Sequence, residues 1–175
     1  MDWQDTVFEL INMRSFNNLW YWILLALVWS AAGQRVLDVP WDMVIRARRG
    51  QDAAAMADLS EMLRITVSRR LRIVDQSGPV LTGLAGFVVT SLALLAVLYG
   101  NEFAQAVLLL AGPLMGVAAL SLRTARRIRD AGLDGPPLVK AVTRLRTQTQ
   151  AIGMVAIFVT AMWGMYKNMN AYVLG

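Results

Sequence analysis

Long uncharged stretches alternate with charged ones along this chain. Four windows contain no Asp, Glu, Lys or Arg: residues 15–34, 76–101, 103–122 and 147–166, with lengths of 20, 26, 20 and 20 residues. Because an α-helix rises about 1.5 Å per residue, about 20 residues cross a hydrocarbon core of about 30 Å. The pattern predicts four transmembrane helices, at about residues 17–36, 78–99, 103–122 and 148–167.

The alternative is a set of core helices in a soluble fold. Residues 87–98 read FVVTSLALLAVL, which is apolar on every side apart from one Thr-Ser pair. A helix of this kind belongs in a large core or in a membrane, and 175 residues offer no large core. The chain is also 57% hydrophobic and only 17% charged, whereas soluble domains have about 45–50% and about 25%. We therefore interpret residues 1–175 as a single all-α domain of a polytopic membrane protein.

Two further segments have amphipathic patterns. Within about residues 52–75, apolar residues recur at steps of three and four and predict a helix with one apolar stripe: Met56, Leu59, Leu63, Val67, Leu71 and Val74. The stripe could lie on an anionic membrane surface or pack on the ends of the protein's own membrane helices. We expect this helix to lead straight into the second span at Gly78 and Pro79. Residues 2–13 could form a short interfacial helix or a frayed tail.

The distribution of basic residues predicts the orientation. Fifteen of the 17 Lys and Arg residues lie in two segments, 35–75 and 123–146, which alternate with the spans. Under the positive-inside rule these segments are cytoplasmic, so both termini are periplasmic. The acidic start of the chain lacks the basic region of a cleavable signal peptide, so the first span is expected to remain as an anchor in a bacterial inner membrane.

Small residues mark two candidate faces for helix packing. Gly112 and Gly116 form a GxxxG spacing, which permits close approach of two helices, and Pro113 is expected to kink the third span beside them. In the fourth span, Ala156, Thr160 and Gly164 repeat small residues every four positions.

The arginines beside the spans are candidate contacts for anionic lipid headgroups. They form two clusters: Arg46, Arg48 and Arg49 in the first basic segment, and Arg123, Arg126, Arg127 and Arg129 in the second. Topology alone accounts for these positions, so nucleic acid is not expected as a partner. The expected partners are membrane lipids and other integral-membrane subunits.

The sequence predicts no catalytic, cofactor-binding or metal site. The chain has no Cys and no His, so disulfides, thiolate or imidazole metal ligands and thiol catalysis are excluded. It has no phosphate-binding glycine motif. Its spans contain no carboxylate, and Glu102 lies at a boundary, where a loop charge is the simplest interpretation. We do not expect an enzyme.

Four short runs of the chain carry a resemblance to known proteins. They occupy residues 13–22, 102–107, 120–127 and 150–154, and they read MRSFNNLWYW, EFAQAV, LSLRTARR and QAIGM. These runs resemble a family of small membrane proteins from Rhodobacter-like alphaproteobacteria. Members of this family are often described as components of the SufBCD complex. The resemblance implies a bacterial inner-membrane protein of a restricted lineage, in which such proteins are often accessory subunits.

Three functional hypotheses follow. The first is a non-catalytic accessory, scaffold or assembly subunit of a larger inner-membrane complex, respiratory or photosynthetic. The second is a small transporter or channel built as an oligomer. The third is a membrane tether for a soluble cytoplasmic partner such as the iron–sulfur assembly machinery, as the family description implies. A water-accessible cavity at mid-span would favour the second hypothesis, and an exposed apolar stripe on the 52–75 helix would favour the third.

Overall fold

The computed structural model describes residues 19–49 and 53–173, and these are almost entirely helical. The elements are α2 (Leu19–Gln34), β1 (Arg35–Val36), β2 (Val39–Pro40), α3 (Trp41–Arg48), α4 (Ala53–Leu98), α5 (Glu102–Asp130) and α6 (Gly135–Val173). The expected all-α class is therefore confirmed. Within the described chain, α4, α5 and α6 are long and apolar enough to cross a membrane. The apolar α2 has 16 residues and starts where the described chain starts, so the count of four spans stays a prediction. The segment 2–13 and the beginning of the first predicted span lie outside the described residues.

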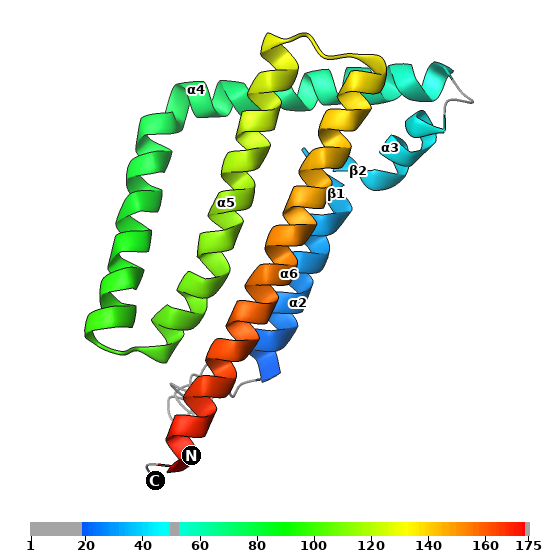
Figure 1. Cartoon of the computed structure of the whole chain (residues 1–175). Helices are drawn as coiled ribbons and strands as arrows, with labels where there is room; N and C mark the ends of the chain where they lie inside the picture. The colour runs from blue at the N-terminus through cyan, green and yellow to red at the C-terminus, as the bar shows by residue number, and fades with distance from the viewer. Residues whose placement is uncertain (1–18, 50–52, 174–175) are drawn as a thin grey trace, which may run out of the picture.

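Helix α4 has two halves with different directions (Figure 1). Its first half, residues 53–78, runs across one end of the bundle, and we call it the crossing half. Its second half, residues 79–98, runs alongside the other long helices, and we call it the membrane leg. The helix is continuous from Ala53 to Leu98 with Pro79 inside it, as expected for a segment that leads straight into a span. Proline removes a backbone donor and bends a helix, which accounts for the change of direction.

The main core lies where the crossing half meets the other helices. Leu59, Leu63, Val67 and Leu71 are at most 2% exposed and belong to one buried cluster with residues of α3, α5 and α6. Their partners in that cluster include Val44, Ala47, Ala125, Ile128, Leu138, Val142 and Leu145. Of the two alternatives for the amphipathic stripe, packing on the protein's own helices is therefore confirmed.

A short hairpin, which the sequence did not predict, joins α2 to α3. Arg35 pairs with Pro40 and Val36 with Val39, and the two residues between the strands have positive φ, 53° at Leu37 and 62° at Asp38. Two positive φ values are typical of a type I′ turn, where Asn and Gly are usual and Leu is not. The Leu37 side chain is 2% exposed in the main core, and this burial offsets the backbone strain.

The second basic segment is mostly helix. Helix α5 continues through Pro113 to Asp130, and α6 begins at Gly135. Between them, Gly132 has φ +55° and its N–H donates to Arg129 O, while Leu133 N–H donates to Ile128 O. This is a Schellman cap. Pro136 and Pro137 follow this cap directly and occupy the first turn of α6, where proline is well tolerated.

At the opposite end of the bundle, Gln105 connects three helices. Its Nε2 donates to Ala96 O at 3.0 Å, and its Oε1 accepts from Trp163 Nε1 at 3.1 Å. Asn101 caps α5 by accepting from Ala104 N–H at 3.1 Å. These bonds tie the α4–α5 turn to α6.

Candidate functional site

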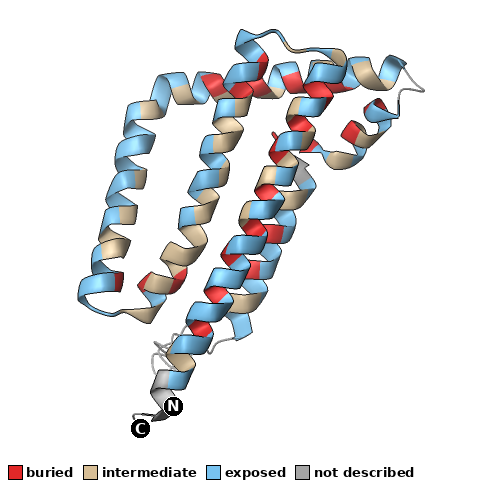
Figure 2. Cartoon of the chain, in the orientation of Figure 1, coloured by how far each residue is buried: buried red, intermediate tan, exposed pale blue. Residues whose placement is uncertain are grey.

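The predicted packing face of α6 lies inside the protein. Ala156 is 5% exposed and Thr160 is fully buried, and Gly164 is buried as well. Ala156 forms a cluster with Leu25 and Trp29 of α2. The Thr160 hydroxyl donates to Ala156 O at 2.7 Å, so the helix itself satisfies this buried polar group. The face therefore joins two helices of one chain, and Figure 2 shows the row of buried residues along α6 where α2 runs beside it.

A close approach at this interface is at Gly153, which sequence reasoning missed. A Cβ placed on Gly153 would lie only 2.7 Å from Trp29 Cε3. Only glycine leaves room for the indole ring there. The sequence contained one signal for this contact, because Gly153 lies in the middle of the predicted span, three residues before Ala156 and on the same helical face.

The other predicted face, at Gly112 and Gly116 of α5, is open. Both residues are exposed, and a Cβ on either would meet no neighbouring atom of the described chain within 4 Å. These glycines therefore do not bring α5 close to another described helix. A contact there with a second molecule stays a prediction.

The membrane leg of α4 carries a further face of small residues. Gly83, Gly86 and Thr90 follow at steps of three and four, so they share one face, and all three are exposed. A Cβ on either glycine would also meet nothing within 4 Å among the described residues. The glycine spacing inside the longest uncharged window was the signal that could have revealed this face. Figure 2 shows that most of the leg is exposed.

Of the seven candidate lipid-binding arginines, two form ion pairs and five have none among the described residues. Arg46 pairs with Asp42 at 3.3 Å. Arg129 pairs with Asp130 at 3.1 Å and with Asp75 at 3.5 Å, and its hydrogen bond to Asp130 is the largest cause of its raised pKa. The remaining five are exposed and have no ion pair among the described residues: Arg48, Arg49, Arg123, Arg126 and Arg127.

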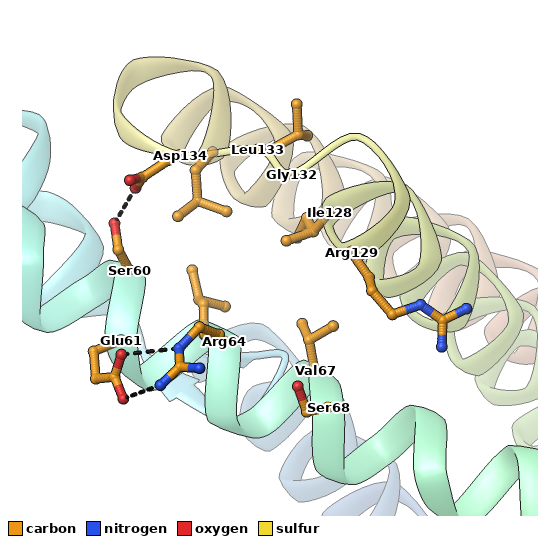
Figure 3. A pocket seen from close by; sticks show the side chains of 12 residues that line it. Ser60, Glu61, Arg64, Val67, Ser68, Ile128, Arg129, Gly132, Leu133 and Asp134 are labelled. Carbon is orange, nitrogen blue, oxygen red and sulfur yellow. Dashed lines mark hydrogen bonds and ion pairs between the residues drawn. The ribbon is translucent and has the colours of Figure 1, made fainter.

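A pocket of about 430 Å³ lies between the crossing half of α4 and the α5–α6 turn (Figure 3). Its charged groups already have partners. Arg64 binds Glu61 through two nitrogens, at 3.0 and 2.7 Å, and this bond lowers the pKa of Glu61. The Ser60 hydroxyl donates to Asp134 at 2.5 Å, and Gly135 N–H donates to the same oxygen at 2.7 Å.

These bonds stabilise the packing of the α5–α6 turn against α4. The Ser60 hydroxyl is the largest cause of the lowered pKa of Asp134, and a carboxylate with a lowered pKa is a poor general base near neutral pH. Ser60 therefore has no activating base in Asp134, and the bond instead fastens the α5–α6 turn to α4. In the part of the chain that the structure describes, no three side chains of His, Cys, Asp or Glu are grouped to hold a metal ion.

The length and apolar composition of the helices bear on the class of the protein. Three described helices are long and apolar enough to span a membrane, which is compatible with a multi-pass membrane protein. Comparison of the chain with protein-family models, with curated proteins and with solved structures finds no match.

Proposed function

We propose that this protein is a non-catalytic accessory or scaffold subunit of a larger bacterial inner-membrane complex, and that the membrane leg of α4 docks against a partner subunit. The observation that carries the proposal is the small-residue face of that leg, formed by Gly83, Gly86 and Thr90, which no described residue covers. A respiratory or photosynthetic assembly is the expected host.

The three sides of the leg support this assignment. One side, with Ala85, Val89 and Ala96, is partly or fully buried. A second side carries large exposed apolar residues such as Leu84 (60% exposed) and Phe87 (70% exposed), as expected for contact with lipid tails. The small-residue face lies between these two sides.

The glycines on this face of α4 are unfavourable unless another helix packs closely against them. Lipid tails are as apolar as Leu, so membrane helices associate through close backbone approach rather than through hydrophobic burial. Each glycine also destabilises a helix interior by about 0.5–1 kcal/mol relative to alanine. Gly83 and Gly86 meet no described neighbour, so a closely packed helix from another subunit is the contact that would offset their cost.

The membrane leg is held in place at both of its ends. The stripe of the crossing half is buried in the main core, and Gln105 holds the other end of the leg through Ala96. A helix that is fixed at both ends and free along its middle is suited to receive a neighbouring helix.

Copurification tests the proposal. The tagged chain is extracted from its native membranes in mild detergent, and its complexes are separated on native gels and identified by mass spectrometry. We expect a defined complex with another integral-membrane protein. The variant Gly83→Leu/Gly86→Leu should insert in full amount but lose that partner, because the new side chains fill the face and their Cβ atoms meet no described neighbour within 4 Å.

A matched control adds bulk on the lipid-facing side of the same helix. The variant Leu84→Phe/Val88→Leu should keep the partner. Loss of the partner in both variants, or in neither, would contradict docking through the small-residue face.

The two other hypotheses have less support. The mid-span groove between α5 and α6 is lined by apolar side chains such as Leu109 and Val155, whereas a transporter requires polar groups at that depth. The stripe of the crossing half is buried, whereas the tether hypothesis requires an exposed one.

We also propose that the end with α3, the crossing half and the α5–α6 turn faces the cytoplasm. Both arginine-rich segments gather at this end of the bundle (Figure 1), which agrees with the positive-inside rule. Both termini would then be periplasmic.

A further inference from the structure

Two open hollows lie between helices α5 and α6. The first, about 280 Å³, lies toward the arginine-rich end, and its polar lining consists of Arg123, Thr124 and Arg127 of α5 with Arg144 and Gln148 of α6. The second, about 580 Å³, lies deeper among the apolar parts of both helices. Leu109, Pro113 and Gly116 line it from α5, and Ala151, Val155 and Val159 line it from α6.

The two hollows follow one another along the same face of each helix, and we call them together one groove. Along α5 the lining positions recur at 109, 113, 116, 120, 123 and 127, and along α6 at 141, 144, 148, 151, 155 and 159. Steps of three and four keep such positions on one face of a helix. One continuous stripe on each helix therefore lines the groove, polar at one end and apolar along the rest.

The polar end carries uncompensated positive charge. Arg123, Arg127 and Arg144 line it, and none of its lining residues is acidic. Among the described residues none of these three guanidinium groups has an ion pair, in contrast with Arg64 and Arg129. Like charges four residues apart on a helix repel each other, so an anion placed between them would relieve this repulsion.

We propose that this groove binds one anionic phospholipid, with the phosphate held by Arg123, Arg127 and Arg144 and an acyl chain lying along Gly116 toward Leu109. Charge complementarity selects an anion, and the apolar continuation of the groove selects a lipid over a free phosphate. Guanidinium groups form strong charge-assisted hydrogen bonds with phosphate oxygens, and basic pockets between membrane helices suit anionic headgroups. The site does not depend on any protein partner.

The groove is longer than one membrane leaflet is deep. Arg123 lies 14 positions after Leu109, which is a rise of about 21 Å along α5, whereas one leaflet contributes about 15 Å, half of a hydrocarbon core of about 30 Å. The groove therefore has room for an acyl chain that crosses the whole leaflet. Arg123 is also the first charged residue after the uncharged window 103–122. The three guanidinium groups therefore lie where lipid headgroups begin.

Lipid binding to the purified full chain tests the proposal. The probes are phosphatidylglycerol and phosphatidylcholine, added separately in detergent, with native mass spectrometry and thermal shift as readouts. We expect retention of one phosphatidylglycerol and a higher Tm with that lipid. The variant Arg123→Gln/Arg127→Gln/Arg144→Gln should bind it on the order of 100-fold more weakly, since each basic residue near anionic lipid contributes about fivefold.

The control variant Arg48→Gln/Arg49→Gln/Arg126→Gln removes the same charge outside the groove and should retain binding. An equal loss in this control would overturn the site in favour of diffuse attraction. Equal retention of phosphatidylcholine, or the same rise in Tm with inorganic phosphate alone, would overturn it as well.

A second pair of variants tests the apolar part without changing charge. Gly116→Leu should fill the groove and weaken phosphatidylglycerol binding, whereas Gly112→Leu, one turn away and outside the lining, should not. Neither new side chain meets a described neighbour at its Cβ, so both variants are expected to fold. Unchanged binding in Gly116→Leu would contradict an acyl chain in the groove.

Discussion

Asp38 and Arg70 form a bidentate ion pair across 32 residues of sequence. Arg70 Nε donates to Asp38 Oδ2 at 2.8 Å, and Arg70 Nη2 donates to Asp38 Oδ1 at 2.7 Å. Asp38 belongs to the β1–β2 turn and has a positive φ of 62°, while Arg70 lies on the crossing half of α4. The pair therefore locks the strained turn after α2 to the helix that crosses the end of the bundle.

This lock should be measurable as a coupling energy. Asp38→Asn removes the charge but tolerates positive φ, so its effect reports on the pair and not on the backbone. Both side chains are more than one-third exposed, so we expect a coupling of about 0.2–1 kcal/mol in a double-mutant cycle with Arg70→Gln. The measurement is thermal or denaturant unfolding in detergent. The coupling energy between Asp38→Asn and the control Arg69→Gln should be near zero. A coupling energy with Arg69→Gln equal to that with Arg70→Gln would contradict a specific pair.

Gly153 should be intolerant of even one methyl group. The Cβ of Gly153→Ala would overlap the buried Trp29 ring, and overpacking of this kind destabilises by about 1–3 kcal/mol. The control Gly112→Ala has open space and should be neutral or slightly stabilising, because alanine favours helix. Melting temperatures check both. Trp29→Phe should partly rescue Gly153→Ala, and a lack of destabilisation in Gly153→Ala would mean that α2 does not lie against α6 as described.

The Ser60–Asp134 bond should make stability depend on pH. The bond lowers the pKa of Asp134 in the folded protein, so its contribution is present above the ordinary aspartate pKa of about 3.9 and is lost as the pH falls through the lowered value. Ser60→Ala should therefore lower the Tm at pH 7. The difference from the parent protein should shrink as Asp134 protonates, and a difference that stays constant at every pH would show that the carboxylate is not involved.

The proposed orientation predicts the behaviour of topology reporters. A reporter that is active only in the periplasm should be active when fused after Gly175. The same reporter inserted near Gly50 or Asp134 should be inactive, because the adjoining arginines retain those segments in the cytoplasm. Changing Arg126 and Arg127 to Glu should leave this pattern intact, since several basic residues remain in each segment. The reverse pattern would refute the orientation.

The sequence anticipated those features that depend on local periodicity. Long uncharged windows corresponded to apolar helices, and the stripe from Leu59 to Leu71 marked the buried side of the crossing half because side chains at steps of three and four share a face. The helix ends were harder to predict. Arginine is a good helix former, so Arg123 marks the edge of the apolar segment while α5 continues to Asp130.

Features that depend on the packing of distant segments were not visible in the sequence. The β1–β2 turn contains Leu37 and Asp38 in place of the usual Asn and Gly, and its conformation depends on a buried side chain and on Arg70. Small residues at Gly112 and at Ala156 look alike in sequence, yet only Ala156 packs on another described helix. The groove with Arg123 and Arg144 required two helices to be placed side by side.

Site-specific photocrosslinking in native membranes tests the central claim most directly. A photoreactive amino acid replaces Thr90, in the middle of the uncovered face of α4, or Val88 on the lipid-facing side as a control. Docking on a partner subunit predicts a covalent adduct from position 90, but not from position 88, with the same integral-membrane protein that copurifies with the parent chain. Adducts at position 90 with lipid alone, or only with a second copy of this chain, would contradict the proposed accessory role.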